Sequence, residues 1–459
     1  MRLPNRAARD QLASALARRR RVSASELASD LCVSVPTLHR MLQEQGGGVV
    51  SGGAARRTRY ALRRALRGNL SDLPLYQVDT DGKASPLATL ALLHPEGTWM
   101  PLAGTSWPAP DNARDGWWDG LPYPLYDMRP QGFMGRQFAR AEHRSLDVAD
   151  DPAHWNDDAI LHVLQRSGSD TSGNLILGDP AFEHWARTKA DPPTPWKASQ
   201  TARAYADLAA QAVATGVAGS SAAGEFPKFA ALRDLEGSAT PHVLVKFSGA
   251  DASTAVQRWS DLLVCEHLAL ECAASMPGIE SARSRIVQAA GRTFLEVERF
   301  DRHGLFGRSR LSSLETLDAA FAGAGTADWS QSSKHLADLH LLAPEDVARV
   351  GRLWWFGRLI ANTDMHAGNL SFRAHPTWQL APTYDMLPMM YAPLAGGEIP
   401  PRDFKLPVPL PAQQPAWLAA CVAAIAFWQR AGRDKRISAP FRQIALRNAA
   451  SLEDLAGRI

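Results

Sequence analysis

Cysteine is scarce in this sequence. Cys32, Cys265, Cys272 and Cys421 are scattered over 459 residues. They have neither the close pairing of zinc sites nor the density that disulfide-stapled secreted domains need. We therefore expect the four cysteines to serve in packing.

Long apolar runs are also missing. The longest one, residues 416–428, falls short of the roughly 20 residues that span a bilayer. The N-terminus is basic but does not lead into the apolar stretch of a signal peptide. These absences predict a cytoplasmic protein without a membrane partner. The chain is long enough, with 45% hydrophobic and 21% charged residues, to form two or three domains.

Acidic residues are rare in the first 68 positions. Residues 1–68 hold 14 Arg and only four acids, which is a net charge of +10. The whole chain carries +3, so the remaining residues sum to −7. Such a block favours a polyanion partner and an association with the nucleoid, although basic segments are often only solvated.

The pattern inside the basic block predicts three short helices and a hairpin. A helix is expected over 8–19, a capping box at 23–26 opens a second, and Ser34 caps a third. The glycines at 52–53 then separate two short strands, so residues 1–68 predict a winged helix-turn-helix that binds duplex DNA. The alternative is a small helical interaction domain with a basic face. Base edges would meet Thr37, His39 and Arg40, and phosphates would meet Arg56, Arg57 and Arg59.

Residues 69–193 combine short apolar segments, turns and many tryptophans. This pattern predicts a compact α+β subdomain. The loop at 121–136 is dense in proline and glycine, which indicates a rigid turn without assignable chemistry.

Three features of a nucleotide site follow in order. The first is a run of small residues within 217–229 that ends in Lys228. Such a run would let backbone N–H groups approach phosphates, although taken alone it also fits a flexible turn. Lys246 lies between apolar neighbours in a predicted strand and is costly to bury unless paired, for which Glu266 on the next helix is the expected partner. The alternative is a surface lysine on an edge strand. The third feature is a strand at 293–301 that runs into a turn, where a hinge could present backbone groups to the adenine of ATP.

The polar turn at 359–372 is the centre of the predicted chemistry. It brings Asp364, His366 and Asn369 between a helix and a short strand, and a second strand leads to Asp385. Phosphoryl transfer needs a carboxylate beside the attacking hydroxyl and oxygen ligands for Mg²⁺, which these side chains could supply. The alternative is that the turn merely ends a helix.

From residue 70 to the C-terminus, this ordered set resembles the HipA-like serine/threonine kinases, toxins of bacterial toxin–antitoxin systems. It is most similar to the branch called HipH or YjjJ, which has its own N-terminal DNA-binding domain. The resemblance implies that Asp364 is the catalytic base and that Asn369 and Asp385 bind Mg²⁺. It implies autophosphorylation at Ser221 or Ser220, and ATP contacts from Ala223, Gly224, Glu225, Lys228, Lys246, Glu298, Phe300, His366, Asn369 and Asp385.

Two residues depart from the family pattern. Phe226 stands where the family usually has Gln, which changes the contacts expected of the phosphate loop. Met386 follows Asp385 without the glycine of the eukaryotic Asp-Phe-Gly segment.

We therefore predict an α+β protein with three parts. They are a winged helix-turn-helix (1–68), a HipA-like α+β subdomain (69–193) and a bilobal kinase core with a largely helical C-terminal lobe (194–459). The predicted activity is ATP- and Mg²⁺-dependent phosphorylation of Ser or Thr in a protein substrate, with duplex DNA and an antitoxin as further partners. The alternatives are a DNA-binding regulator with an inactive kinase-like domain, and a small-molecule kinase.

Overall fold

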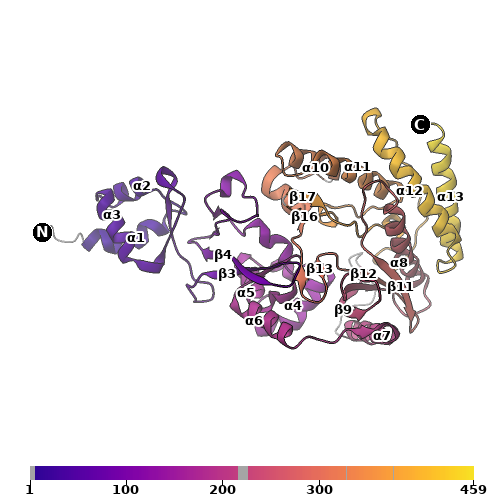
Figure 1. Cartoon of the computed structure of the whole chain (residues 1–459), viewed down its shortest axis with the longest axis horizontal. Coiled ribbons are helices and arrows are strands. Elements are labelled where there is room, and N and C mark those ends of the chain that lie inside the picture. The colour runs from indigo at the N-terminus through magenta and orange to yellow at the C-terminus, as the bar shows by residue number, and fades with distance from the viewer. Residues whose placement is uncertain (1–5, 215–225, 327, 376) are drawn as a thin grey trace. The chain divides into compact units, whose positions relative to one another are not determined.

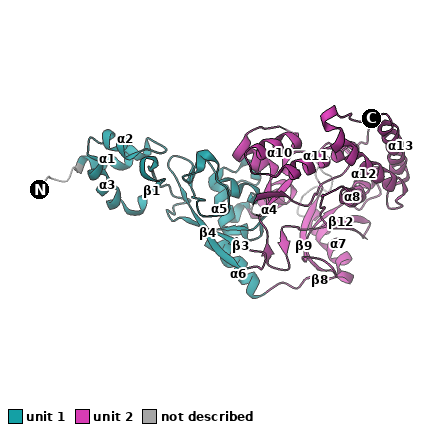
Figure 2. Cartoon of the chain, turned by 45° about the horizontal axis from the view of Figure 1, so that its top comes forward, with its two compact units in different colours: residues 1–78, 83–129, 143–191 teal, residues 79–82, 130–142, 192–459 magenta. Residues whose placement is uncertain are grey.

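The computed structural model describes residues 6–214, 226–326, 328–375 and 377–459 (Figure 1). The chain forms two compact units (Figure 2). Unit 1 consists of Met1–Val78, Lys83–Arg129 and His143–Asp191, and unit 2 of Asp79–Gly82, Pro130–Glu142 and Pro192–Ile459. The division of the first 193 residues into two domains stays a prediction.

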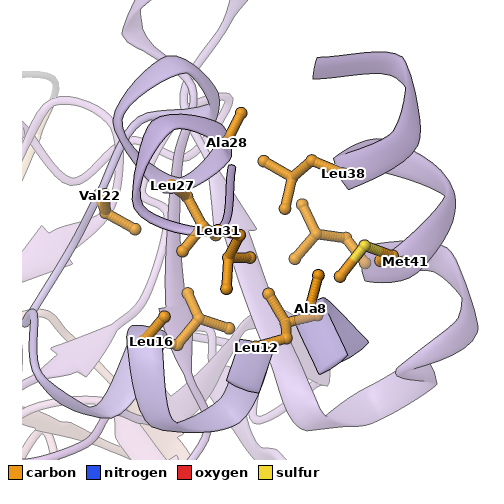
Figure 3. Close-up of a cluster of buried hydrophobic side chains, with 11 residues drawn as sticks. Ala8, Leu12, Leu16, Val22, Leu27, Ala28, Leu31, Leu38 and Met41 are labelled. Carbon is orange, nitrogen blue, oxygen red and sulfur yellow. The ribbon is translucent and has the colours of Figure 1, made fainter. Parts of the chain in front are cut away.

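Unit 1 begins with α1 (Arg6–Ala17), α2 (Ala24–Asp30) and α3 (Val35–Glu44). The capping box is confirmed, because the Ser23 hydroxyl accepts from the backbone N–H of Glu26 while the Glu26 carboxylate accepts from that of Ser23. The Ser34 hydroxyl caps α3 by accepting from the backbone N–H of Thr37, without the reciprocal bond of a capping box. The three helices enclose a small apolar core (Figure 3) that includes Leu12, Leu16, Leu27, Leu38 and Met41.

A hairpin follows the three helices. Strands β1 (Val49–Gly52) and β2 (Arg59–Leu62) pair antiparallel. Val50 and Ala61 belong to one buried cluster with Ala91, Leu93 and Trp117, which come from the next part of unit 1. The hairpin therefore shares its core with the sheet that follows it.

That sheet has the strand order β6-β5-β4-β3-β7. Two tryptophans on it, Trp99 and Trp117, lie so close to Gly52 of the hairpin that a side chain at that glycine would collide with them. The strands are β3 (Leu73–Val78), β4 (Ala84–Leu92), β5 (Thr98–Trp99), β6 (Trp117–Trp118) and β7 (Leu175–Leu177). Helices α5 (Asp157–Ser167) and α6 (Asp179–Ala190) contact this sheet, whereas most of α4 (Gly132–Leu146) belongs to unit 2.

The main sheet of unit 2 has the order β11-β12-β10-β9-β8. Strand β10 lies in the middle, so Lys246 on it is not on an edge strand. Alternate residues of β10 face opposite sides: Val243 and Val245 pack with Tyr205 of α7, while Lys246 faces α8. The elements are β8 (Trp196–Lys197), β9 (Lys228–Asp234), β10 (His242–Phe247), β11 (Ser284–Ala289) and β12 (Arg292–Glu298), with α7 (Ala198–Ala214) and α8 (Thr254–Ala273).

The rest of unit 2 is mainly helical, as the sequence predicts. Helix α12 lies beside α8, α11 and α13 (Figure 1). The helices are α9 (Leu314–Leu317), α10 (Trp329–Asp338), α11 (Pro344–Leu359), α12 (Gln414–Arg433) and α13 (Ala439–Ala456), and the short strands are β13 (Arg302–His303), β14 (Gly307–Arg308), β15 (Ser312–Ser313), β16 (Ser371–His375) and β17 (Thr377–Leu380). No helix among the described residues is long and apolar enough to cross a membrane.

Candidate active site

The polar turn begins where α11 ends at Leu359. The indole N–H of Trp428 on α12 donates to the Leu359 carbonyl (3.0 Å), which holds this helix end in place. Ala361 then adopts a left-handed backbone (φ 58°) that takes the chain out of the helix. After the turn, β16 pairs with β17. The predicted arrangement of helix, turn and hairpin is therefore confirmed.

Hydrogen bonds inside the turn orient its polar side chains. The amide Nδ2 of Asn369 donates to the backbone carbonyl of Asp364 (2.8 Å), which leaves the amide oxygen to accept or to bind a cation. The His366 Nδ1 accepts from the backbone N–H of Gly368 (3.1 Å). His366 thus caps the short 3-10 helix Ala367–Asn369, while Asp364 is exposed.

Lys246 joins two carboxylates. Its Nζ donates to both oxygens of Glu266 on α8 (2.8 and 2.9 Å) and forms an ion pair with Asp385. The Lys246 and Glu266 side chains are buried, whereas that of Asp385 is 27% exposed. The predicted Lys–Glu pair is present, and Asp385 shares its cation.

Charges in this cluster shift three pKa values. Burial and the nearby Asp385 raise the pKa of Glu266 to about 7 in spite of the Lys246 ammonium. Burial alone would raise the pKa of Asp385, but Lys246 and Lys228 outweigh it and lower that pKa to about 2. Burial alone would lower the pKa of Lys246, but the two carboxylates outweigh it and raise that pKa. Asp385 is therefore ionised near neutral pH.

Phe226 packs at the end of the predicted phosphate loop. Its buried ring meets Trp259 of α8 edge-on, with centroids 4.7 Å apart at 77°, and lies 5.9 Å from the Lys246 Nζ. Lys228 is the partner of Lys246 in the register of β9 and β10. Phe226, the residue that departs from the family pattern, thus packs over the buried Lys246. The predicted residues Ser220, Ser221, Ala223, Gly224 and Glu225 lie outside the described residues.

The predicted hinge lies where β12 ends. The Glu298 carboxylate is buried and accepts from Arg233 (2.7 Å), and the Glu298 backbone N–H donates to the Arg283 carbonyl (2.8 Å), so neither group is free to contact a base. The ring of Phe300 lies 5.7 Å from that of Tyr384, the residue before Asp385. The hinge and the segment carrying Asp385 therefore lie side by side.

Asn362 is a site residue that the sequence reasoning missed. Its amide oxygen accepts from the backbone N–H of Asp364 (3.0 Å), and its Nδ2 donates to the backbone carbonyl of Asp385 (3.3 Å). In the sequence Asn362 looks like an ordinary turn residue, since its second partner is 23 positions away. No local signal could have identified it.

Comparisons with known proteins agree with this arrangement. Two family models match the chain: the YjjJ-like toxin, middle domain, over residues 69–186, and the HipA-like C-terminal domain over residues 220–444. Toxin YjjJ of Escherichia coli (strain K12) is 37% identical over 425 residues, which are 92% of this chain and 93% of that protein. The chain belongs to the YjjJ-like toxin family. The resemblance drawn from the motifs is confirmed.

The fold of this YjjJ-like chain is also similar to a solved HipA structure. A chain from the complex of Shewanella oneidensis MR-1 HipA, HipB and operator DNA matches with a TM-score of 0.50, over 84% of this chain and 97% of that one. The sequence identity is 15%, so this likeness concerns the fold alone.

The residues present fit a magnesium ion. Amide and carboxylate oxygens such as those of Asn369 and Asp385 are ligands that Mg²⁺ accepts, and in kinase-type sites the ion takes few protein ligands beside phosphates and water. The lowered pKa of Asp385 keeps its oxygens unprotonated. No group of three His, Cys, Asp or Glu side chains in the described part of the chain could hold a metal by itself.

The predicted DNA-contacting residues of this YjjJ-like chain lie on α3 and the hairpin. His39 and Arg40 are exposed, whereas the Thr37 hydroxyl is hydrogen-bonded to the capping Ser34 (2.9 Å). On the hairpin, Arg56 is exposed, Arg57 pairs with Asp115 (3.3 Å), and Arg59 donates to the carbonyls of residues 56 and 58. The contact of these residues with DNA stays a prediction.

Proposed function

We propose that this protein is an ATP- and Mg²⁺-dependent kinase that phosphorylates Ser or Thr of a protein substrate. The observation that carries the proposal is the cluster of Lys246, Glu266 and Asp385, which Asn362 links to the turn of Asp364. A buried lysine held by a helical glutamate beside a metal-binding aspartate is the arrangement that orients nucleotide phosphates in kinases.

Each side chain has a distinct role in the proposed reaction. Lys246 would hold the phosphates, because Glu266 keeps its ammonium in one place. Asp364, exposed at the turn, would accept the proton of the substrate hydroxyl. Asn369 and Asp385 would bind Mg²⁺, which neutralises charge on the transferred phosphoryl group. Autophosphorylation at Ser221 or Ser220 stays a prediction.

We further propose that α1 to α3 and the β1–β2 hairpin form a winged helix-turn-helix that binds duplex DNA. The net charge of +10 over residues 1–68 and the exposed His39 and Arg40 on α3 support this proposal. The HipA chain of similar fold was solved with HipB and operator DNA, which supports an antitoxin as a further partner.

Loss of the proposed base tests the kinase proposal. We expect the full-length chain to transfer labelled phosphate from Mg·ATP to a protein of a cell lysate, resolved by mass. Asp364→Asn should lower the rate by about 10² to 10⁴, because general-base assistance is lost, while ATP binding is retained. Asp403→Asn, which changes an exposed acid of the same unit, should have little effect.

Three outcomes would contradict the proposal. Asp364→Asn turnover within a few-fold of wild type would exclude Asp364 as the base. Transfer to small molecules but to no protein would favour a small-molecule kinase. DNA binding without any phosphoryl transfer would favour the regulator with an inactive kinase-like domain.

A further inference from the structure

Asn362 connects the two segments that carry the proposed chemistry. It is 6% exposed and follows the end of α11. Its side chain bonds the backbone of Asp364 on one side (3.0 Å) and that of Asp385 on the other (3.3 Å). The one amide group therefore spans the proposed base and the proposed metal ligand.

The backbone around Asn362 is itself anchored. The Asn362 N–H donates to the Gly357 carbonyl in α11 (2.9 Å), and the carbonyl of Ala361 accepts from Met390 (3.1 Å), beyond Asp385. Asn362 is thus fixed to the helix, and its side chain extends from a fixed point.

The segment it bonds is strained. Asp385 has a left-handed backbone (φ 54°), a conformation that is unfavourable for a residue other than glycine and persists only where its surroundings hold it. The hydrogen bond from Asn362 to the Asp385 carbonyl acts on that same residue. The amide is therefore placed to keep Asp385 in this conformation.

An amide meets both partners at this position. One bond needs an acceptor for the Asp364 N–H, and the other needs a donor for the Asp385 carbonyl. An ionised carboxylate accepts but does not donate, and a leucine side chain does neither. Asparagine has both functions on a short side chain.

We propose that Asn362 is a positioning residue that sets the separation between Asp364 and Asp385. The inference rests on the proposed kinase function and goes beyond it, because it assigns the alignment of base and metal ligand to one neutral side chain. Reacting groups must be held within a fraction of an ångström, and groups outside the direct ligand set often change metal affinity or activity 10- to 100-fold.

The test compares Asn362→Asp with Asn362→Leu in the full-length chain. N362D keeps the acceptor for Asp364 but loses the donor to Asp385 and brings a negative charge against its carbonyl. We expect kcat to fall about 10- to 100-fold and the Mg²⁺ concentration for half-maximal activity to rise several-fold, with KM for ATP at saturating Mg²⁺ changed less than about threefold. N362L should lose more in kcat.

A binding measurement keeps the test independent of turnover. ATP with increasing Mg²⁺ should raise the melting temperature of wild type at a lower Mg²⁺ concentration than that of N362D. Asn448→Asp is the matched control, since it removes an amide on α13 that donates to the Tyr391 hydroxyl (2.9 Å). N448D should leave kcat and the Mg²⁺ requirement unchanged.

The outcomes separate the inference from the kinase proposal. N362D with wild-type kcat and Mg²⁺ requirement overturns the inference while the kinase proposal stands. A wild type that binds Mg·ATP without transferring phosphate overturns the kinase proposal. The inference is then tested only by whether N362D needs more Mg²⁺ than wild type for the rise in melting temperature. A lower melting temperature without any Mg²⁺ shift would make Asn362 merely structural and overturn the inference.

Discussion

Lys246 is the side chain on which both acids of the site, the buried Glu266 and the half-buried Asp385, depend. Its ammonium donates to both oxygens of Glu266 and pairs with Asp385, so one positive charge faces two carboxylates. Burial, together with the nearby Asp385, raises the pKa of Glu266 in spite of this ammonium. A nucleotide phosphate approaching Lys246 would compete with Asp385 for the ammonium.

We predict that Lys246→Met destabilises unit 2 by about 3–5 kcal/mol, because two acids are left in the site without their cation. Adding Glu266→Gln should recover part of this loss, since one buried charge is removed, but should not restore phosphoryl transfer. Denaturant unfolding and a kinase assay measure the two effects. Lys334→Met, at an exposed lysine of α10, is the control. A double variant no more stable than K246M would contradict the prediction.

At the scale of elements, a buried ion network joins the strands of the unit 2 sheet. Arg233 on β9 bonds Glu296 and Glu298 on β12 (both 2.7 Å), and Glu296 also accepts from Tyr205 on α7 (2.7 Å) and from Arg285 on β11 (2.7 Å). One carboxylate thus connects three strands and a helix behind the hinge.

The acid dependence of this network can be predicted. Burial alone would raise the pKa of Glu296, but hydrogen bonds from Arg285, Tyr205 and Arg233 outweigh it and lower the pKa below its ordinary value of 4.5. Glu296 therefore stabilises the fold above that pH, and this stabilisation is lost as the pH falls further, through the folded-state pKa.

We predict that Glu296→Gln lowers the free energy of unfolding of unit 2 by about 3–5 kcal/mol near neutral pH, because the buried Arg233 loses one of its two counter-charges and Arg285 loses its ion-pair partner. The difference from wild type should shrink below about pH 4.5, where the wild-type carboxylate becomes protonated. Denaturant unfolding at several pH values measures it, with the exposed Glu453→Gln as control. A difference that stays constant with pH would contradict the assigned network.

The β1–β2 hairpin depends on the next sheet for its core. Trp117→Ala should remove the side chain that covers Val50 and Ala61, at a cost of about 3–5 kcal/mol. We predict faster tryptic cleavage after Arg56 and Arg57 at the hairpin tip, measured by mass spectrometry. Trp185→Ala, in a separate buried cluster of unit 1, is the control. Equal cleavage rates in the two variants would mean that the hairpin is held by its own strands.

At the scale of the molecule, acids of unit 1 offset part of the N-terminal charge. Arginines of the basic block form ion pairs with acids that follow it in the chain. These pairs are Arg20–Glu96, Arg21–Asp119, Arg57–Asp115, Arg63–Asp72, Arg64–Asp158 and Arg67–Asp147. The net charge of residues 1–68 therefore overstates the charge available to DNA.

We predict that the full-length chain binds duplex DNA with a log-log salt slope of about −0.9 per phosphate contacted. Arg56→Ala should weaken binding to all sequences, whereas Arg40→Ala should alter sequence preference. Asp115→Asn should strengthen binding a few-fold by releasing Arg57, and Asp111→Asn, whose partner is Arg114, is its control. A salt titration on random and selected duplexes measures this. Absent binding at low salt would favour a protein-interaction domain.

The sequence by itself determined what depends on near neighbours. The capping box at Ser23, the strand that carries Lys246 and the polar turn at Asp364 were all predictable, because helix caps, strand alternation and turns are decided within a few residues. Their order along the chain was enough to indicate the family. The buried lysine also implied a carboxylate partner, since an unpaired charge is too costly to bury.

Only the tertiary structure decided which distant residues meet. Lys246 forms an ion pair with Asp385, which is 139 positions away in the sequence, and Asn362 hydrogen-bonds to Asp385, which is 23 positions away. Trp117 completes the core of the hairpin. These contacts arise when separate elements pack, so local patterns do not encode them. The physical reason is that the same asparagine is a plain turn residue in an isolated chain and bridges two carboxylate-bearing segments only after α11 and β17 bring them together.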